Sequence, residues 1–174
     1  MTENILIIIF GKVTFLILVA IAFVNRVLTR KEKIDFQFDN VMKYVDERIV
    51  IFERMASFVE ETVEEEMNFV NKLNDSKDIL NEMFDTKNYN TKEIIKSEKL
   101  LKKFPELLKT YPNLSKNEIF NILSNEVDTN INRIEYATAT YNEKVKEYNE
   151  FKKSKLNAFI CKIFKLNDYE YYEK

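Results

Sequence analysis

The chain has 174 residues and a formal net charge of -2 from 27 basic and 29 acidic side chains, with one glycine, two prolines, one cysteine and neither histidine nor tryptophan. Sheet proteins need turn residues at short intervals, and nucleotide-binding α/β folds need glycine where the backbone approaches phosphate, so this composition excludes both and predicts an all-α protein. The lack of histidine excludes a Ser-His-Asp triad and histidine-based zinc hydrolase motifs, and the balanced charge gives no general attraction to nucleic acid.

An apolar stretch near the N-terminus, residues 5–24, is long enough to cross a bilayer as a helix. Lys12 is its only charged residue, and the long stem of a lysine can reach toward the interface. We interpret the stretch as an uncleaved transmembrane anchor behind a short tail, residues 1–4. The alternative is a secretory signal, since Ala20 and Ala22 have the spacing of small residues that signal peptidase accepts, but the first four residues lack a positive charge.

A linker rich in basic residues, residues 25–37, follows the apolar stretch. Before the stretch, Glu3 is the only charged side chain. The positive-inside rule therefore predicts a single-pass protein with its N-terminus outside and its large C-terminal part in the cytoplasm. The cations of the linker are also candidates for contact with anionic lipid head groups; they are Arg26, Arg30, Lys31 and Lys33. The plainer alternative is a flank that only stops transfer.

Beyond the linker, apolar residues recur in steps of three and four from Val41 to Leu73. This pattern predicts one long helix with a single buried stripe. We expect the helix to continue through residues 79–84, with a separate turn after Asn74 as the alternative. Residues 85–90 are then the predicted loop.

Two pairs of residues have the spacing of a capping box, in which each side chain bonds the free backbone amide of the other residue. Asn90 with Glu93 predicts one helix start, and Ser115 with Glu118 predicts another. Each pair therefore marks the boundary of a helix that follows a loop.

A shorter apolar stripe runs from Ile94 to Tyr111 between these two starts. Pro105 is expected to bend this helix, and Pro112 is expected to end it, because proline lacks the amide that a helix interior needs.

A second long apolar stripe runs from Phe120 to Phe151. At 1.5 Å per residue, this stripe and the first one each span roughly 50 Å. Matched amphipathic helices bury each other's stripes, so the pattern predicts an antiparallel helical bundle with coiled-coil-like packing over residues 38–166. The remaining residues, 167–174, form an aromatic and acidic tail that we expect to fray.

Spaced aromatic, asparagine and proline residues mark the second half of the chain. The sequence reads YPNL at 111–114, NRI at 132–134, YN at 141–142 and YN at 148–149. This pattern resembles the LemA family of bacterial membrane-anchored helical proteins, which has YP-x-L-x-x-N-x-x-F, then N-R-I-x-x-A-R-x-x-Y-N-x-x-V-x-x-Y-N and an aromatic-acidic tail. The resemblance implies a LemA-like four-helix bundle behind an anchor in the bacterial inner membrane, and it implies no defined activity.

Two departures from the LemA pattern bear on any binding role. Thr138 stands where the family usually has arginine, and the stretch at residues 53–59, ERMASFV, lacks the family's proline in the first long helix. A surface built by that helix is therefore expected to differ from the family's, while the expected fold is unaffected.

The YN pairs at 141–142 and 148–149 are seven residues apart, so the two tyrosines share one helix face and the two asparagines share the adjacent face. We expect the tyrosines in the core and the asparagines at a helix interface, where an amide bonded to a neighbouring helix fixes the register. The alternative is a polar groove that receives a partner. The candidates for these roles are Asn132, Arg133, Tyr141, Asn142, Tyr148 and Asn149.

The strongest remaining candidate for chemistry is an acidic cluster on the first long helix, Glu60, Glu61, Glu64, Glu65 and Glu66. Carboxylates at i and i+4 share a helix face and can hold a hard cation. Di-iron bundles also use histidine from facing helices, so we interpret the cluster as a solvated acidic face. No metal site, cofactor or catalytic residue is expected.

Cys161 lies in an apolar stretch, residues 158–164, that lysines flank. As the only cysteine it cannot form an internal disulfide. We interpret the stretch as a short final helix docked on the end of the bundle. The alternative is a basic amphipathic helix on the membrane surface, which requires the long helices to lie flat or fold back.

Three functional hypotheses follow. The first is a non-enzymatic membrane-anchored scaffold or adaptor for other proteins. The second is a protein that organises membranes by self-association and lipid contact, and the third is an enzyme that uses only carboxylates, lysines or a metal. The expected partners are membrane lipid at the anchor and an unidentified protein or a second copy, with neither nucleic acid nor a small-molecule substrate.

Overall fold

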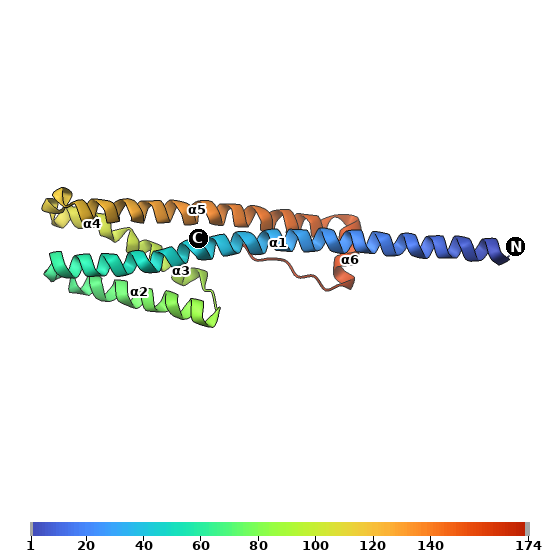
Figure 1. Cartoon of the computed structure of the whole chain (residues 1–174), viewed down its shortest axis with the longest axis horizontal. Coiled ribbons are helices and arrows are strands. Elements are labelled where there is room, and N and C mark those ends of the chain that lie inside the picture. Colours follow the sequence, from blue (N-terminus) through green and yellow to red (C-terminus); the bar gives the residue numbers. More distant parts are fainter. Residues whose placement is uncertain (1, 173–174) are drawn as a thin grey trace. The chain divides into compact units, whose positions relative to one another are not determined.

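The structure is a computed structural model that describes residues 2–172, without the side chains of residues 2, 3, 155 and 156. The last two residues of the predicted tail lie outside this description. Over the described residues the chain is all-α, as the composition predicts (Figure 1). The helices are α1 Thr2–Thr62, α2 Met67–Thr86, α3 Thr91–Leu101, α4 Lys103–Thr110, α5 Glu118–Lys153 and α6 Lys155–Ile163, with 3-10 turns at Glu64–Glu66 and Pro112–Lys116.

The described chain forms two compact units. The first unit combines the residues up to Phe36 with Lys144–Tyr169, and the second combines Gln37–Glu143 with the residues from Glu170 onward. Helices α1 and α5 each contribute to both units.

The core of the second unit consists of the apolar stripes that the sequence predicts. On α1, Val41, Val45 and Phe52 are fully buried, and on α5 Phe120 and Val127 are fully buried. Because α5 covers the whole of the second predicted stripe, the prediction of a long helix over that region is confirmed.

Aromatic rings join the helices of the second unit. Phe104 of α4 stacks on Phe120 of α5, with 4.9 Å between ring centroids, and Phe58 of α1 lies 6.0 Å from each of them. The ring of Phe38 on α1 lies 5.4 Å from Tyr89 in the loop after α2 and 5.9 Å from Tyr141 of α5. Such edge-to-face and offset pairs fix the relative positions of the helices within this unit.

The first long helix is shorter at its C-terminal end than the sequence predicts. The prediction of one helix through residues 41–73 is wrong, because α1 ends at Thr62 and α2 begins at Met67. Val63 between them has a non-helical backbone, with φ at -139° and ψ at 70°. Two causes act together: the β-branched pair Thr62 and Val63 has low helix propensity, and the adjacent acidic run places like charges one turn apart.

The loop after α2 agrees with the prediction, since Lys87 closes α2 in the left-handed conformation with φ at 53°. At the next helix, the Asn90 side chain accepts a hydrogen bond from the Lys92 amide at 3.0 Å, so the predicted start of α3 is confirmed. Glu93 forms an ion pair with Lys96 at 3.4 Å.

The predicted cap at Ser115 is wrong. Asn117 caps α5 instead, because its side chain accepts from the Phe120 amide at 3.1 Å, whereas the Ser115 hydroxyl donates to the Pro112 carbonyl. The predicted bend at Pro105 falls earlier, at Lys102 between α3 and α4. Pro105 itself lies in the first turn of α4, where the missing amide costs no helical bond.

In the first unit, the apolar stretch of α1 is exposed from Ile5 to Ala22, whereas Phe23 and Val27 are buried. Among the described residues, α1 is the one helix that is long and apolar enough, by length and composition, to cross a membrane. The helix continues without a break through the predicted linker, residues 25–37. Phe151 of α5 stacks on Phe23, with ring centroids 5.9 Å apart.

Candidate functional site

Arg48 of α1 is fully buried in the second unit, with an exposed fraction of 0%. Its Nε donates to Asn130 Oδ1 on α5 at 3.0 Å. Its Nη1 donates to the Ile94 carbonyl and the Ser97 hydroxyl on α3, at 2.8 and 2.7 Å. Nη2 is buried and has no hydrogen-bond partner among the described residues. One guanidinium group therefore joins three helices.

The surroundings of Arg48 are polar as well as buried. Burial lowers the pKa of Arg48 to about 10, and nearby Glu98 and Tyr172 partly offset the effect. The Glu98 carboxylate also pairs with Lys102 at 2.8 Å. Burial raises the pKa of the Tyr172 phenol to about 12, and Glu98 adds to the rise while Arg48 opposes it. At neutral pH Arg48 is therefore a cation and Tyr172 is a neutral phenol.

The sequence pattern does not predict Arg48 as a core residue. The apolar residues in steps of three and four between Val41 and Leu73 include Ile49, but Ile49 is only half-buried while Arg48 occupies the buried position. Arg48 lies three residues after Val45 and four before Phe52, and this spacing places it on the same helix face as the apolar stripe. The sequence feature that could have indicated a buried Arg48 is therefore a cation at a stripe position. A buried cation in such a position needs partners from other helices, and those become visible only in the folded chain.

Asn142 holds the end of the tail within the second unit. Its amide nitrogen donates to the Tyr172 carbonyl at 3.0 Å, and its oxygen accepts from the Tyr172 amide at 2.8 Å. The Tyr141 hydroxyl donates to the neighbouring Glu170 carbonyl at 3.1 Å. The Asn142 side chain therefore forms its hydrogen bonds with the backbone of the tail. The predicted partner, a neighbouring helix, is wrong for this residue.

Asn149 makes the same pair of bonds within the first unit. Its amide nitrogen donates to the Tyr169 carbonyl at 3.0 Å, and its oxygen accepts from the Tyr169 amide at 3.2 Å. Each asparagine thus satisfies one donor and one acceptor of a segment that has no regular secondary structure of its own. The tail is packed as far as Tyr172, so the expectation that it frays is wrong for its described part.

The two tyrosines of the YN pairs lie in the core, as expected. Tyr141 is 9% exposed and Tyr148 is 0% exposed. The Tyr148 ring lies edge-on to Tyr169, with centroids 5.1 Å apart. The Tyr148 hydroxyl has no hydrogen-bond partner among the described residues, and burial raises the pKa of this phenol to about 12.

The other two residues of the candidate set lie on the surface of α5. Asn132 is exposed. Arg133 pairs with Glu47 of α1 at 3.1 Å, and its guanidinium lies 5.8 Å from the Tyr44 ring centroid. The structure therefore separates the six candidates into a tail-binding group, a core group and a surface group.

The basic residues of the predicted linker differ in their surroundings. Arg26 and Lys33 are exposed, and Lys31 is half-buried. The Arg30 guanidinium lies 4.3 Å above the Phe151 ring, within the first unit. Contact with lipid head groups stays a prediction for all four, and Arg30 also has a cation–π partner in the protein.

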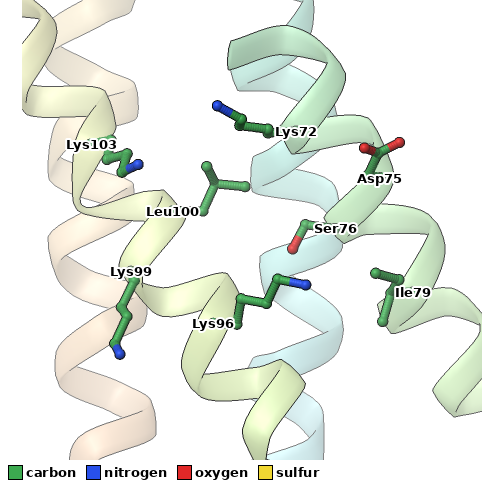
Figure 2. A pocket seen from close by; sticks show the side chains of 8 residues that line it. All are labelled: Lys72, Asp75, Ser76, Ile79, Lys96, Lys99, Leu100 and Lys103. Carbon is green, nitrogen blue, oxygen red and sulfur yellow. The ribbon is translucent and has the colours of Figure 1, made fainter. Parts of the chain in front are cut away.

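An open pocket between α2, the C-terminal half of α3 and the first residue of α4 has four lysines around it. Figure 2 shows Lys96 reaching across the pocket toward Ser76, whereas Lys99 points away. The pocket has a volume of about 370 Å³, and its lining residues are Lys72, Asp75, Ser76, Ile79, Lys96, Lys99, Leu100 and Lys103. All four lysines are exposed, so the pocket is a solvated basic surface.

A second open groove of about 580 Å³ lies between α1 and α5 in the second unit. Two of its lining residues are exposed and apolar, since Val50 is 55% exposed and Ile122 is 44% exposed. Two ion pairs join the helices along the groove, namely Arg133 with Glu47 and Arg54 with Glu126, and the second pair lies between the levels of Val50 and Ile122. The groove thus combines exposed apolar side chains with charged ones.

The acidic cluster lies around the end of α1. Glu60, Glu61, Glu64 and Glu65 are exposed, and Glu66 accepts a hydrogen bond from the Tyr111 hydroxyl at 3.3 Å. Within the part of the chain that the structure describes, no group of three or more acidic or cysteine side chains is placed to hold a metal ion.

These features define a class of protein: a helical bundle with one exposed apolar helix that is long enough to span a membrane. The sequence profile of the LemA family matches residues 37–174. Because this match covers most of the chain, the protein belongs to the LemA family. No curated protein matches the sequence.

Proposed function

We propose that the protein is a non-enzymatic, membrane-anchored scaffold or adaptor whose bundle binds another protein. The observation that carries this proposal is the groove between α1 and α5, where Val50 and Ile122 are exposed and two ion pairs join the helices. A groove that presents exposed apolar side chains together with charged ones supports an interface with a partner.

The groove fits an amphipathic helix of the partner. Two neighbouring helices form a linear channel, and a third helix can place apolar residues over Val50 and Ile122. The ion pairs of the groove present both signs of charge, so charged residues along the edges of the partner helix can pair with Arg54 or Glu47. The charged side chains then set the orientation, and the exposed apolar side chains supply affinity.

The proposed location is the inner membrane, with the bundle in the cytoplasm. The exposed stretch from Ile5 to Ala22 supports a membrane anchor, because about 20 apolar residues match the thickness of the hydrocarbon layer. The basic residues after the stretch support the cytoplasmic side. An adaptor in this position would recruit its partner to the inner face of the membrane.

Photo-crosslinking in cells tests the proposal. A benzophenone amino acid at Ile122 is expected to capture a discrete protein partner after irradiation. The matched control is the same amino acid at Asp128, which is exposed on α5 outside the groove. Equal capture at both positions, or none at Ile122, would contradict the proposal, and a product of two copies of this chain would favour self-association instead.

A further inference from the structure

Helix α6 presents an apolar surface to solvent. Phe159, Ile163 and Phe164 are 69%, 60% and 57% exposed, whereas Cys161 on the same helix is 4% exposed. The face of α6 that carries Cys161 therefore packs on the protein. The large apolar side chains on the other side are not covered by any residue that the structure describes. Two phenylalanines and an isoleucine within six residues are costly to leave in water.

The position of α6 is fixed within the first unit. The Phe151 ring, which lies just before α6, stacks on Phe23 at 5.9 Å and accepts the Arg30 guanidinium above it at 4.3 Å. The Asn157 side chain of α6 donates to the Phe151 carbonyl at 2.9 Å. Phe23 is the penultimate residue of the apolar stretch, so Phe151 links the start of α6, which follows α5 in Figure 1, to the part of α1 where that stretch ends.

The charged side chains on α6 and directly beside it are lysines. Helix α6 has no acidic residue, and Lys153, Lys162 and Lys165 on it or beside it are exposed. The nearest acids along the chain, Glu150 and Asp168, each pair with a lysine: Glu150 with Lys146 at 4.0 Å, and Asp168 with Lys152 at 2.6 Å, which lowers the pKa of the Asp168 carboxyl. Exposed lysines next to exposed phenylalanines match the anionic head groups and the acyl boundary of a bilayer.

We propose that α6 is an interfacial helix that inserts Phe159, Ile163 and Phe164 into the bilayer that holds the anchor. The inference rests on the proposed anchoring of residues 5–24 and goes beyond it, because it assigns a second lipid contact on a separate helix. Such helices lie in the plane of the interface, with their apolar side about 5–10 Å into the head-group and acyl boundary. The long helices need not lie flat, because Phe151, four residues before α6, packs on Phe23 at the end of the apolar stretch.

The lack of tryptophan in the chain allows a direct test with single-tryptophan variants. The full chain is reconstituted in vesicles of phosphatidylcholine and phosphatidylglycerol, with or without brominated acyl chains. Phe159→Trp reports on α6, Phe15→Trp reports on the anchor, and Tyr136→Trp reports on an exposed site of the second unit. Far-UV circular dichroism checks that each variant keeps its helix content.

The expected result is loss of emission from Phe159→Trp and Phe15→Trp in brominated bilayers, with Tyr136→Trp unchanged. Quenching of Phe15→Trp without quenching of Phe159→Trp would overturn the α6 inference and leave the anchor intact. No quenching at Phe15→Trp would instead overturn the anchoring itself. Equal quenching at all three positions would show general adsorption and also overturn the assignment to α6.

A charge-reversed variant tests the role of the lysines. Lys162→Glu together with Lys165→Glu, in the Phe159→Trp background, is expected to reduce quenching in the anionic bilayer. A short-wavelength emission of Phe159→Trp that no brominated lipid quenches would place α6 against protein, such as a second copy, and would overturn the lipid contact.

Discussion

Arg48 joins α1, α3 and α5 through one buried guanidinium group, and its replacement tests how much of the bundle depends on it. Arg48→Ala is expected to lower the free energy of unfolding by about 3–5 kcal/mol, because it leaves a cavity and removes the partner of Asn130 and Ser97. The measurement is chemical unfolding of the full chain in mild detergent, followed by circular dichroism.

Arg54→Ala is the matched control for Arg48→Ala, since Arg54 lies on the same helix and forms an exposed ion pair. Its expected cost is only about 0–1 kcal/mol, because solvent screens such pairs. Similar losses for the two variants would show that the buried network is not the source of the stability.

Tyr148 is a buried phenol whose hydroxyl has no hydrogen-bond partner among the described residues. Its pKa is about 12 in the folded chain against an ordinary value of 10.0, because burial disfavours the phenolate. Between these values the unfolded chain loses the proton and the folded chain keeps it, so the free energy of unfolding falls as pH rises through the window.

Tyr148→Phe removes both the orphan hydroxyl and this titration. At neutral pH the variant is expected to match the wild type or to gain up to about 1 kcal/mol of stability. Above pH 10 its unfolding free energy should fall less steeply than that of the wild type. Parallel unfolding curves from pH 8 to pH 12 provide the measurement, and identical slopes would contradict the assignment.

Among the elements, the tail differs from the helices because side chains of α5 satisfy its backbone. Asn142→Ala removes both bonds to Tyr172, each with a net value of about 0.5–1.5 kcal/mol, so the end of the tail should open more often. Hydrogen exchange of the C-terminal peptide is expected to become faster. Asn132→Ala, at an exposed position of α5, should leave the exchange unchanged, and equal behaviour of the two variants would disprove the role of Asn142.

For the whole molecule, the side of the membrane decides which partners the bundle can meet. In a Cys161→Ala background, Tyr136→Cys places a thiol at a position that is 76% exposed. A membrane-impermeant maleimide is expected to label it only after permeabilisation, because the basic residues after the anchor favour a cytoplasmic bundle. Asn4→Cys, before the apolar stretch, should label in intact cells, and the reverse pattern would place the bundle outside.

The sequence alone determined the helical class, the apolar segment, the two long stripes and the family resemblance. These features follow from local composition and from periodicity, because few turn residues and apolar residues in steps of three and four leave little choice of secondary structure. The caps show the limit of such reasoning, since Asn90 caps α3 as predicted whereas Asn117 replaces Ser115 at α5. Several polar residues lie near that helix start, and only the path of the chain selects among them.

The tertiary structure decided the burial of Arg48, the docking of the tail on Asn142 and Asn149, and the packing of Phe151, shortly before α6, on Phe23 of α1. Each depends on contacts between residues that are distant along the chain. A buried cation and an extended tail are stable only when other segments supply their hydrogen bonds, and local sequence patterns do not specify which segments those are.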